Sequence, residues 1–418
     1  MSDRFDVVIA GAGPAGAQCA RDLAARDYDV LVLETEPEAE FPRQSNKSTA
    51  GTFPSMMASF GVPDDVVMQY TDAVVLESPN DHYVRDQPGA VLEFAEFKRW
   101  LVADGRSKGA EYRFDSRATA PIEEAGSVVG VRYDGSTEVY ADVVIDATGP
   151  AAPLAKALDV CDLKRENQAI GIEWELSGID LDAPGYADLH DAMMLRLDHD
   201  IAPGGYSWIF HTGGDTAKVG LCYIQNDRHR EHADDGLTID GYLDRWLESD
   251  PRFTNANRME GRVHRGSAHI QLPSDLSTDG FMAIGDTVPT IDPLWGEGIH
   301  KGMKSGRVAA ATADRCLTPA EPDTSAENMA VYDDLWHTEV APRVRKRLLM
   351  TELLYLASND RYDRLMRDLR SSDGDTLARI NAGDRSAFPK LLHTSDLRLL
   401  GRFAKERFLE GSSRWGDS

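Results

Sequence analysis

Cysteine is scarce in this chain of 418 residues. The four cysteines are scattered, and no Cys-x-x-Cys pair occurs. This spacing argues against a zinc ribbon, an iron–sulfur cluster and a disulfide framework. We therefore expect that the protein has no metal site and resides in a reducing compartment. The cysteines are Cys19, Cys161, Cys222 and Cys316.

Long apolar runs are missing too. No run of about 18 apolar residues, the length that a membrane span needs, appears anywhere. The first residues, MSDRFDVVIAGAG, enter a strand pattern directly and lack the regions of a signal peptide. We expect a cytoplasmic protein.

Positive charge is in short supply. The chain has 45 Lys+Arg against 70 Asp+Glu and a net charge of -25, which disfavours binding to nucleic acid. Asp exceeds Glu by 46 to 24, and Arg exceeds Lys by 34 to 11. This usage is typical of proteins from a high-salt cytoplasm, where ions screen an acidic surface. An acidic protein from a low-salt cell is the alternative, and salt dependence separates the two.

A glycine-rich turn follows the first strand pattern. The segment FDVVIAGAGPAGAQCARDLAARDYDVLVLETE predicts a strand over 7–10, a helix over about 15–25 and a strand over 30–33 that leads into Glu34. Such a turn brings the backbone close to a pyrophosphate at the helix N-terminus, and the acid accepts hydrogen bonds from ribose hydroxyls. We predict a dinucleotide-binding unit for FAD or NAD. Its turn residues are Gly11, Gly13, Pro14, Ala15 and Gly16.

Two later segments favour FAD. ADVVIDATGP is an apolar strand running into Ala-Thr-Gly, and DGFMAIGDTVPTIDPLWGEGIHKGMKSGRVAAATA is a strand followed by a glycine-rich helix start. With the first motif they resemble the FAD-binding framework of the p-hydroxybenzoate hydroxylase-like flavoproteins. The resemblance implies that Asp286 binds the ribityl chain, although a turn aspartate is the alternative. It also implies that the helix opening at Gly298 and Ile299 points its positive end at the isoalloxazine.

The same resemblance extends the candidate cofactor site. The framework usually has an arginine where Phe94 stands in FAEFKRWL, which leaves Arg99 as a substitute. The remaining cofactor candidates are Thr49, Gly51, Ala118, Gly149 and Gly296.

Between these segments, residues from about 161 to 267 predict strands that would form an antiparallel roof over the flavin. In one of them, PGGYSWIFH, alternate side chains share a face, so three aromatic residues lie together on the face that we expect to be covered. Periodicity alone does not say whether core or ligand covers it. The aromatic residues are Tyr206, Trp208 and Phe210, and the other face carries Ser207, Ile209 and His211.

PGGYSWIFH matches, in all but its last position, the Pro-x-x-Tyr-x-Trp-x-Phe-Pro signature of the geranylgeranyl reductase family, which the chain resembles over nearly its whole length. The resemblance implies an FAD enzyme that saturates prenyl double bonds, typically of archaeal digeranylgeranyl-glycerol lipids, geranylgeranyl diphosphate or a related isoprenoid. With the acidic composition, it also implies a haloarchaeal source. Tyr206, Trp208 and Phe210 would then face the substrate, because an apolar tail is held by buried area at about 25 cal/mol per Å².

Besides Phe94, the sequence departs from the family pattern in two places. His211 replaces the final proline of the signature; this is either a change without consequence at the end of a strand or an added polar group near the pocket mouth, and we favour the former. The segment NKSTAGT lacks the cysteine that many members have there. The proton donor is therefore open. Tyr206 is the best candidate, and a tyrosine that only orders the roof is the alternative.

The predicted architecture is α/β (α+β overall). A Rossmann FAD-binding domain comprises 1–70, 92–160 and 268–320, a substrate domain with an antiparallel sheet comprises 71–91 and 161–267, and 321–418 form a separate helical region. In the last region, APRVRKRLLMTELLYLA places basic residues beside an apolar helix. That helix would either approach a lipid surface or pair its arginines with nearby acids, and we favour the pairing.

The expected partners are a prenyl lipid and an external electron donor. No second Gly-x-Gly-x-x-Gly unit is present, so electrons would come from transiently bound NAD(P)H or from a carrier such as ferredoxin. Three other functions stay open: an FAD monooxygenase of the same fold, a non-catalytic prenyl-binding protein, and a quinone-linked dehydrogenase, which the missing cysteine cluster disfavours.

Overall fold

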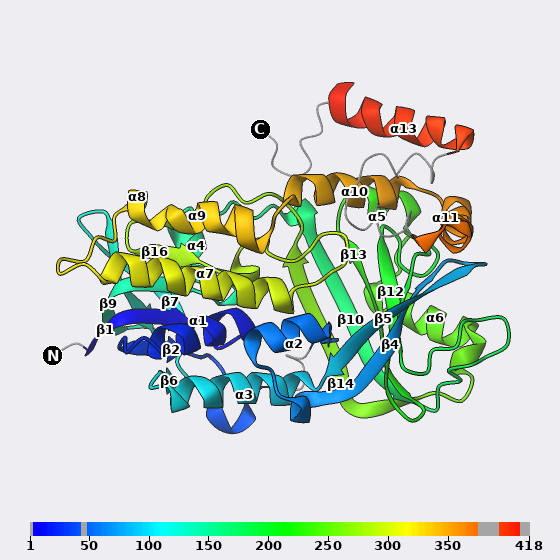
Figure 1. Cartoon of the computed structure of the whole chain (residues 1–418). Helices are drawn as coiled ribbons and strands as arrows, with labels where there is room; N and C mark the ends of the chain where they lie inside the picture. The colour runs from blue at the N-terminus through cyan, green and yellow to red at the C-terminus, as the bar shows by residue number, and fades with distance from the viewer. Residues whose placement is uncertain (1–2, 43–47, 375–392, 410–418) are drawn as a thin grey trace.

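The computed structural model describes residues 3–42, 48–374 and 393–409 and places its strands in two β-sheets (Figure 1). The first sheet holds the N-terminal strand and the second holds the aromatic strand. The first sheet consists of β1 (Asp3–Ala10), β2 (Val30–Leu33), β6 (Glu111–Arg113), β7 (Ala118–Glu124), β8 (Ser127–Tyr133), β9 (Thr137–Asp146), β15 (Ser277–Thr278) and β16 (Phe281–Ala283).

The first sheet has the order β15-β16-β9-β1-β2-β6, with β8 beside β9 and β7 beside β8. Strands β16, β9, β1, β2 and β6 run parallel. The apolar stretches VVIA, VLVL and VVI of its central strands are buried, as is usual where both faces of a parallel sheet are covered. Helix α1 (Pro14–Ala24) packs against both α3 (Phe94–Ser107) and α7 (Ile299–Leu317) (Figure 1).

The second sheet has the order β14-β10-β13-β12-β11-β4-β5-β3. Its neighbours are antiparallel, but β11 and β4 run parallel. The predicted all-antiparallel sheet is therefore wrong at this pair, because a long stretch of chain separates β4 from β11 and no hairpin fixes their directions. The strands are β3 (Gly51–Thr52), β4 (Val67–Glu77), β5 (His82–Leu92), β10 (Gln168–Ser177), β11 (Ala192–Arg196), β12 (Gly205–Gly213), β13 (Thr216–Ile224) and β14 (Asn257–His269).

Both faces of the second sheet are covered. The face that carries Ile209 packs on α6 (Ile239–Ser249), and Ile209 and Leu221 there are fully buried beside Trp246. The aromatic face lies against the segment around Thr49 and the loop before α7. The expectation that only the aromatic face is covered was therefore incomplete, since β10, β12 and β13 also present an apolar face to α6.

Some of the described segments after residue 320 pack on the sheets: the segment with Tyr332 and Trp336 on the first sheet, and α11 on β5 of the second, whereas α13 packs on α10. Tyr332 and Trp336 are buried in the core of the first sheet, and Tyr332 Oη donates to the carbonyl of Ala283 at 3.0 Å. The other α-helices among the described residues are α2 (Pro54–Phe60), α4 (Pro153–Ala157), α5 (Asp227–His232), α8 (Ala326–Met329), α9 (Val331–Leu335), α10 (Val344–Leu356), α11 (Asn359–Ser371) and α13 (Leu397–Ala404).

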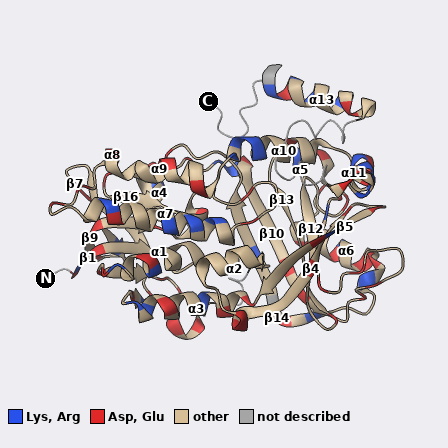
Figure 2. Ribbon diagram, in the orientation of Figure 1, with Lys and Arg blue, Asp and Glu red and all other residues tan. Residues whose placement is uncertain are grey.

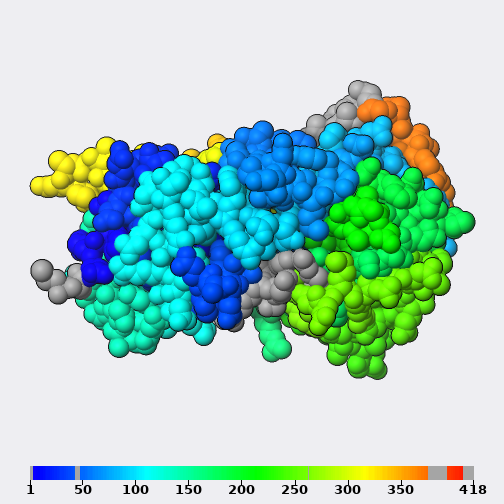
Figure 3. Space-filling view, turned by 90° about the horizontal axis from the view of Figure 1, so that it is seen from below, coloured from blue at the N-terminus to red at the C-terminus, as the bar shows by residue number. Residues whose placement is uncertain are grey.

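The surface carries charges of both signs. Figure 2 shows acidic residues spread over loops and helices, with basic residues at the start of α10. Seen from below, the outline is elongated, with residues up to about 150 at the left and centre and residues of about 190–260, in green, at the right (Figure 3).

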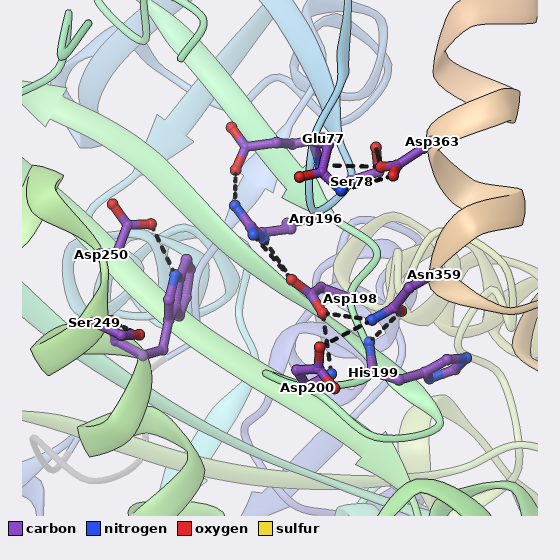
Figure 4. Close-up of polar contacts among 12 residues, drawn as sticks. Glu77, Ser78, Arg196, Asp198, His199, Asp200, Ser249, Asp250, Asn359 and Asp363 are labelled. Carbon is purple, nitrogen blue, oxygen red and sulfur yellow. Dashed lines mark hydrogen bonds and ion pairs between the residues drawn. The ribbon is translucent and has the colours of Figure 1, made fainter. Parts of the chain in front are cut away.

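A buried ion network ties β4 and β11 to the turn after α6. Glu77 accepts hydrogen bonds from Arg196 at 2.5 Å and from Arg252 at 2.9 and 3.0 Å. Arg196 also pairs with Asp198 (Figure 4). Arg252 also pairs with Asp250. The network thus links β4, β11 and the turn after α6.

Candidate cofactor and substrate site

The turn between β1 and α1 has the backbone that a phosphate site needs. Gly11 has φ +103°, and a Cβ there would meet the carbonyl of Ala147 at 2.4 Å, so no other residue fits. Space is open above Gly13, where nothing lies within 4 Å of a Cβ position. Pro14 begins α1, followed by Ala15 and Gly16.

Glu34 lies at the end of β2 and is buried. Its carboxylate accepts hydrogen bonds from the backbone N–H groups of Ala12 at 2.8 Å and Glu36 at 3.0 Å. The acid is therefore held against the glycine turn, where ribose hydroxyls of a dinucleotide would lie.

Lys98, which the sequence analysis missed, lies buried near Glu34. Burial lowers the pKa of Lys98, against the opposing effects of Glu34 and Glu36. The predicted substitute Arg99 points elsewhere: it donates to the carbonyl of Phe41 at 3.2 Å and to Glu96, with 48% of its side chain exposed. The buried positions of α3 could have revealed this, because Lys98 falls in its i, i+3, i+4 stripe.

The end of β9 joins the two halves of the predicted cofactor site. Gly149 donates its N–H to Thr287 Oγ1 at 3.0 Å, which connects the Ala-Thr-Gly loop to the turn that contains Asp286. Asp146, also missed, fixes this loop by accepting from the N–H groups of Thr148, Leu154 and Ala155. Burial raises the pKa of Asp146, and these hydrogen bonds oppose the rise. Ala118 is buried at the start of β7.

Asp286 lies on a short turn after β16 and caps no helix. Burial raises the pKa of Asp286 to about 6. Within the described part of the chain, no group donates a hydrogen bond to its carboxyl group. The carboxyl oxygens can therefore accept hydrogen bonds from the hydroxyl groups of a ligand. An acceptor without a protein partner fits the ribityl chain of FAD better than it fits a turn aspartate.

The loop before α7 meets the aromatic strand. Helix α7 begins at Ile299 with Gly298 as its N-cap, so its positive end faces the loop. Gly296 has φ +67°, and a Cβ there would lie 2.0 Å from Tyr206 Oη. Asp292 holds the loop by accepting from the N–H groups of Leu294 and Trp295, both at 3.1 Å.

Tyr206, Trp208 and Phe210 share the face of β12 that turns toward this loop. The rings of Tyr206 and Trp208 are 5.8 Å apart, and a Cβ at Gly51 would meet the Phe210 ring at 2.4 Å. Burial raises the pKa of Tyr206, as do the neighbouring Cys222 and Tyr355. The structure thus brings Gly51, Gly296 and the three aromatics to one face.

Glu173 is the main residue on this face that the sequence analysis missed. Trp208 Nε1 donates to Glu173 Oε2 at 2.8 Å, and Thr49 Oγ1 donates to the same oxygen. In the strand pattern IEWEL, the side chains of Glu173 and Trp174 point to opposite faces of the sheet. Only the pairing of β10 with β13 shows which of these faces points inward.

His211 lies on the opposite face and is buried. Its Nδ1 accepts the N–H of Asp191 at 2.9 Å, and its Nε2 is 3.1 Å from the carbonyl of Gly214. The histidine ties two turns together at the end of the strand.

Among residues 3–42, 48–374 and 393–409, no three His, Cys, Asp or Glu side chains are arranged to hold a metal ion. No helix in these ranges is long and apolar enough to cross a membrane.

Comparisons with known proteins agree with the site. A family model described as the geranylgeranyl reductase catalytic domain matches residues 179–263, and a lycopene cyclase model matches residues 6–193. The chain is 68% identical over 408 residues to the digeranylgeranylglycerophospholipid reductase of Haloferax volcanii, which covers 98% of this chain and 100% of that protein. The chain belongs to the geranylgeranyl reductase family. The predicted family and the predicted reductase activity class are thereby confirmed.

Other members of the geranylgeranyl reductase family are more distant. The digeranylgeranylglycerophospholipid reductase of Methanosphaerula palustris is 30% identical, over 86% of this chain and 88% of its own length. A geranylgeranyl bacteriochlorophyll reductase-like protein of Thermoplasma acidophilum has the same fold, with a TM-score of 0.79, 22% identity and 98% of both chains covered. The flavin-dependent brominase Bmp2 also shares the fold, with a TM-score of 0.71, 19% identity, and coverage of 98% of this chain and 99% of its own.

Proposed function

We propose that this protein saturates the double bonds of the geranylgeranyl chains in digeranylgeranylglycerophospholipids. The observation that carries the proposal is the full-length match to a haloarchaeal relative of that name, at 68% identity. The aromatic face of β12 next to the predicted flavin loop supports it.

FAD fits the residues of the first sheet. Gly11, Gly13 and the start of α1 would hold the pyrophosphate, Glu34 the ribose, and Asp286 the ribityl hydroxyls. Thr49, Gly51, Ala118, Gly149, Gly296, Gly298 and Ile299 stay candidates for further contacts, whereas Arg99 has its bonds to Phe41 and Glu96. When bound and reduced, the flavin supplies a hydride to an alkene carbon.

The protein's own part is to hold the alkene and exclude water. Tyr206 and Trp208 offer rigid apolar area to a chain that has no polar handle. Burial keeps Tyr206 protonated at neutral pH, because its pKa is raised from an ordinary value of 10.0. Near the loop end of α7, negative charge is stabilised by the helix dipole, which favours an anionic reduced cofactor.

The domain boundaries predicted above, with an FAD-binding part and a substrate part, remain part of this proposal. Electrons would come from NAD(P)H or a ferredoxin-like carrier. Contact with the inner face of the membrane would bring the enzyme to its lipid. The basic start of α10 supports that contact only in part, since Arg347 pairs with Asp292 at 3.1 Å.

Product mass tests the proposal. The purified protein is reduced with dithionite without oxygen in high salt and mixed with digeranylgeranylglycerophospholipid. We expect the flavin to become oxidised and the lipid to gain two hydrogens for each saturated bond. A gain of an oxygen atom after exposure to air would indicate a monooxygenase, and flavin that stays reduced with every prenyl lipid would contradict the proposal.

A further inference from the structure

Glu173 lies in the middle of the aromatic face. It pairs across strands with Gly220, and Gly220 pairs with Trp208, so the three positions form one row. A Cβ at Gly220 would meet Trp208 Cζ2 at 2.5 Å. The Glu173 carboxyl group and the Trp208 indole therefore meet above Gly220, which has no side chain.

Only one oxygen of this carboxyl group is used. Oε2 accepts the hydrogen bonds from Trp208 and Thr49. Glu173 is 3% exposed, and its Oε1 has no hydrogen-bond partner among the described residues. A buried oxygen left without a partner destabilises the fold, so it calls for a functional explanation. The pattern suits a carboxylic acid whose carbonyl oxygen accepts two bonds and whose hydroxyl group is left to donate.

The titratable groups around Glu173 have other contacts. His264 lies opposite on β14 and is 3.0 Å from Glu175. Lys218 on β13 donates to the carbonyls of Ser48, Thr49 and Leu92 at 3.0–3.2 Å. The next row holds Cys222 and Tyr206, and burial raises the pKa of the Cys222 thiol to about 12.

Glu173 is connected to both predicted cofactor segments. Thr49, which bonds to it directly, precedes Gly51 on one side. On the other side, the Trp208 ring lies next to Tyr206, whose hydroxyl group contacts the position of Gly296. The free oxygen is thus part of the face on which the alkene would lie.

We propose that Glu173 is the acid that protonates the alkene, with Trp208 and Thr49 positioning it. This rests on the proposed function. When bound and reduced, FAD would supply the hydride for one alkene carbon and would itself be oxidised. The O–H bond at Glu173 Oε1 breaks, its proton forms a C–H bond at the other carbon, and the π bond is lost. The Glu173 carboxylate then recovers a proton from water.

The central test is Glu173→Gln in the full FAD-loaded protein. Glutamine keeps an oxygen that accepts from Trp208 and Thr49 but has no acidic proton. We expect single-turnover flavin oxidation by the phospholipid to slow at least about 100-fold, the effect of a general acid. FAD content and the spectral change on lipid binding should stay as in the wild type. Glu166→Gln, an exposed glutamate just before β10, is the control.

A second measurement needs no turnover. Infrared difference spectra between wild type and Glu173→Gln should contain a carboxylic-acid C=O band, present only in the wild type and shifted in D2O. Thr49→Val removes one donor to Oε2 and should move the alkaline limb of the pH–rate profile to higher pH, because a carboxylate with fewer donors is harder to form.

The outcomes separate the two proposals. Glu173→Gln turnover within threefold of the wild type would overturn the role of Glu173, as would a missing acid band or an unmoved pH limb in Thr49→Val. If wild-type protein binds the phospholipid but never oxidises its flavin, the proposed function fails instead, whatever the infrared result.

Discussion

Asp286 is a residue at which stability and cofactor binding oppose each other. Its half-buried carboxyl group has no hydrogen-bond partner in the described chain, and desolvation raises its pKa from 3.8 to about 6. The folded apoprotein therefore binds this proton more tightly than the unfolded chain does. The contribution of Asp286 to the free energy of unfolding is therefore most favourable below pH 4 and falls as the pH rises toward 6. Above pH 6 the folded protein bears the full cost of the ionised carboxylate.

Asp286→Asn should stabilise the FAD-free protein and weaken FAD binding. Above pH 6 we expect FAD-free protein to gain up to about 3 kcal/mol of unfolding free energy, and at pH 4 to gain almost none. FAD affinity should fall because hydroxyl groups lose a charged acceptor. Denaturant unfolding at both pH values and calorimetric FAD titration measure the two effects. The exposed Asp72→Asn should change neither, and equal stabilisation at pH 4 and pH 7.5 would contradict the assignment.

Gly220 leaves the space that Trp208 occupies. A Cβ there would lie 2.4 Å from the carbonyl of Ile172 and 2.5 Å from the indole. Gly220→Ala should therefore displace Trp208 and raise the KM for prenyl lipid at least about tenfold, since apolar contact area is lost. FAD content should not change. Gly266→Ala on β14, with nothing within 4 Å of its Cβ, is the matched control, and an unchanged KM in Gly220→Ala would argue against a substrate role for Trp208.

At the scale of elements, β4 and β11 depend on the buried ion network around Glu77 (Figure 4). Arg252 is fully buried and bonds to both Glu77 and Asp250. Each carboxylate would lose a charged partner if the guanidinium were removed, whereas the pair itself adds little beyond its desolvation cost.

Arg252→Ala should destabilise the protein by about 3–5 kcal/mol, because it leaves buried carboxylates poorly paired. Arg245→Ala, which breaks an exposed pair with Asp234, should cost less than about 1 kcal/mol. Denaturant unfolding at fixed salt compares the two variants. Similar losses of unfolding free energy in both variants would show that the buried network does not stabilise β4 and β11.

At the scale of the whole molecule, the net charge of -25 destabilises the folded state, because the excess acidic side chains repel one another. Salt shortens the screening length from about 10 Å at 0.1 M to about 3 Å at 1 M. We therefore expect the thermal midpoint to rise steeply with KCl up to molar concentrations. Sucrose at matched osmolality is the control for solute exclusion. A midpoint that hardly changes with KCl would favour an acidic protein from a low-salt cell.

The elements predicted from local patterns were recovered well. The strand predicted over 7–10 lies within β1, and the strand predicted over 30–33 is β2, because apolar runs reflect burial directly. The segment PGGYSWIFH likewise forms most of β12. The direction of β11 against β4 was missed, since parallel pairing leaves no local signal.

The sequence by itself determined the glycine turn, the helix start at Ile299 and the aromatic face, because each depends on spacing within one short segment. Tertiary structure alone decided that Glu173 meets Trp208 and Thr49. These contacts join residues 35 and 124 positions from Glu173, and only the register of paired strands brings them together.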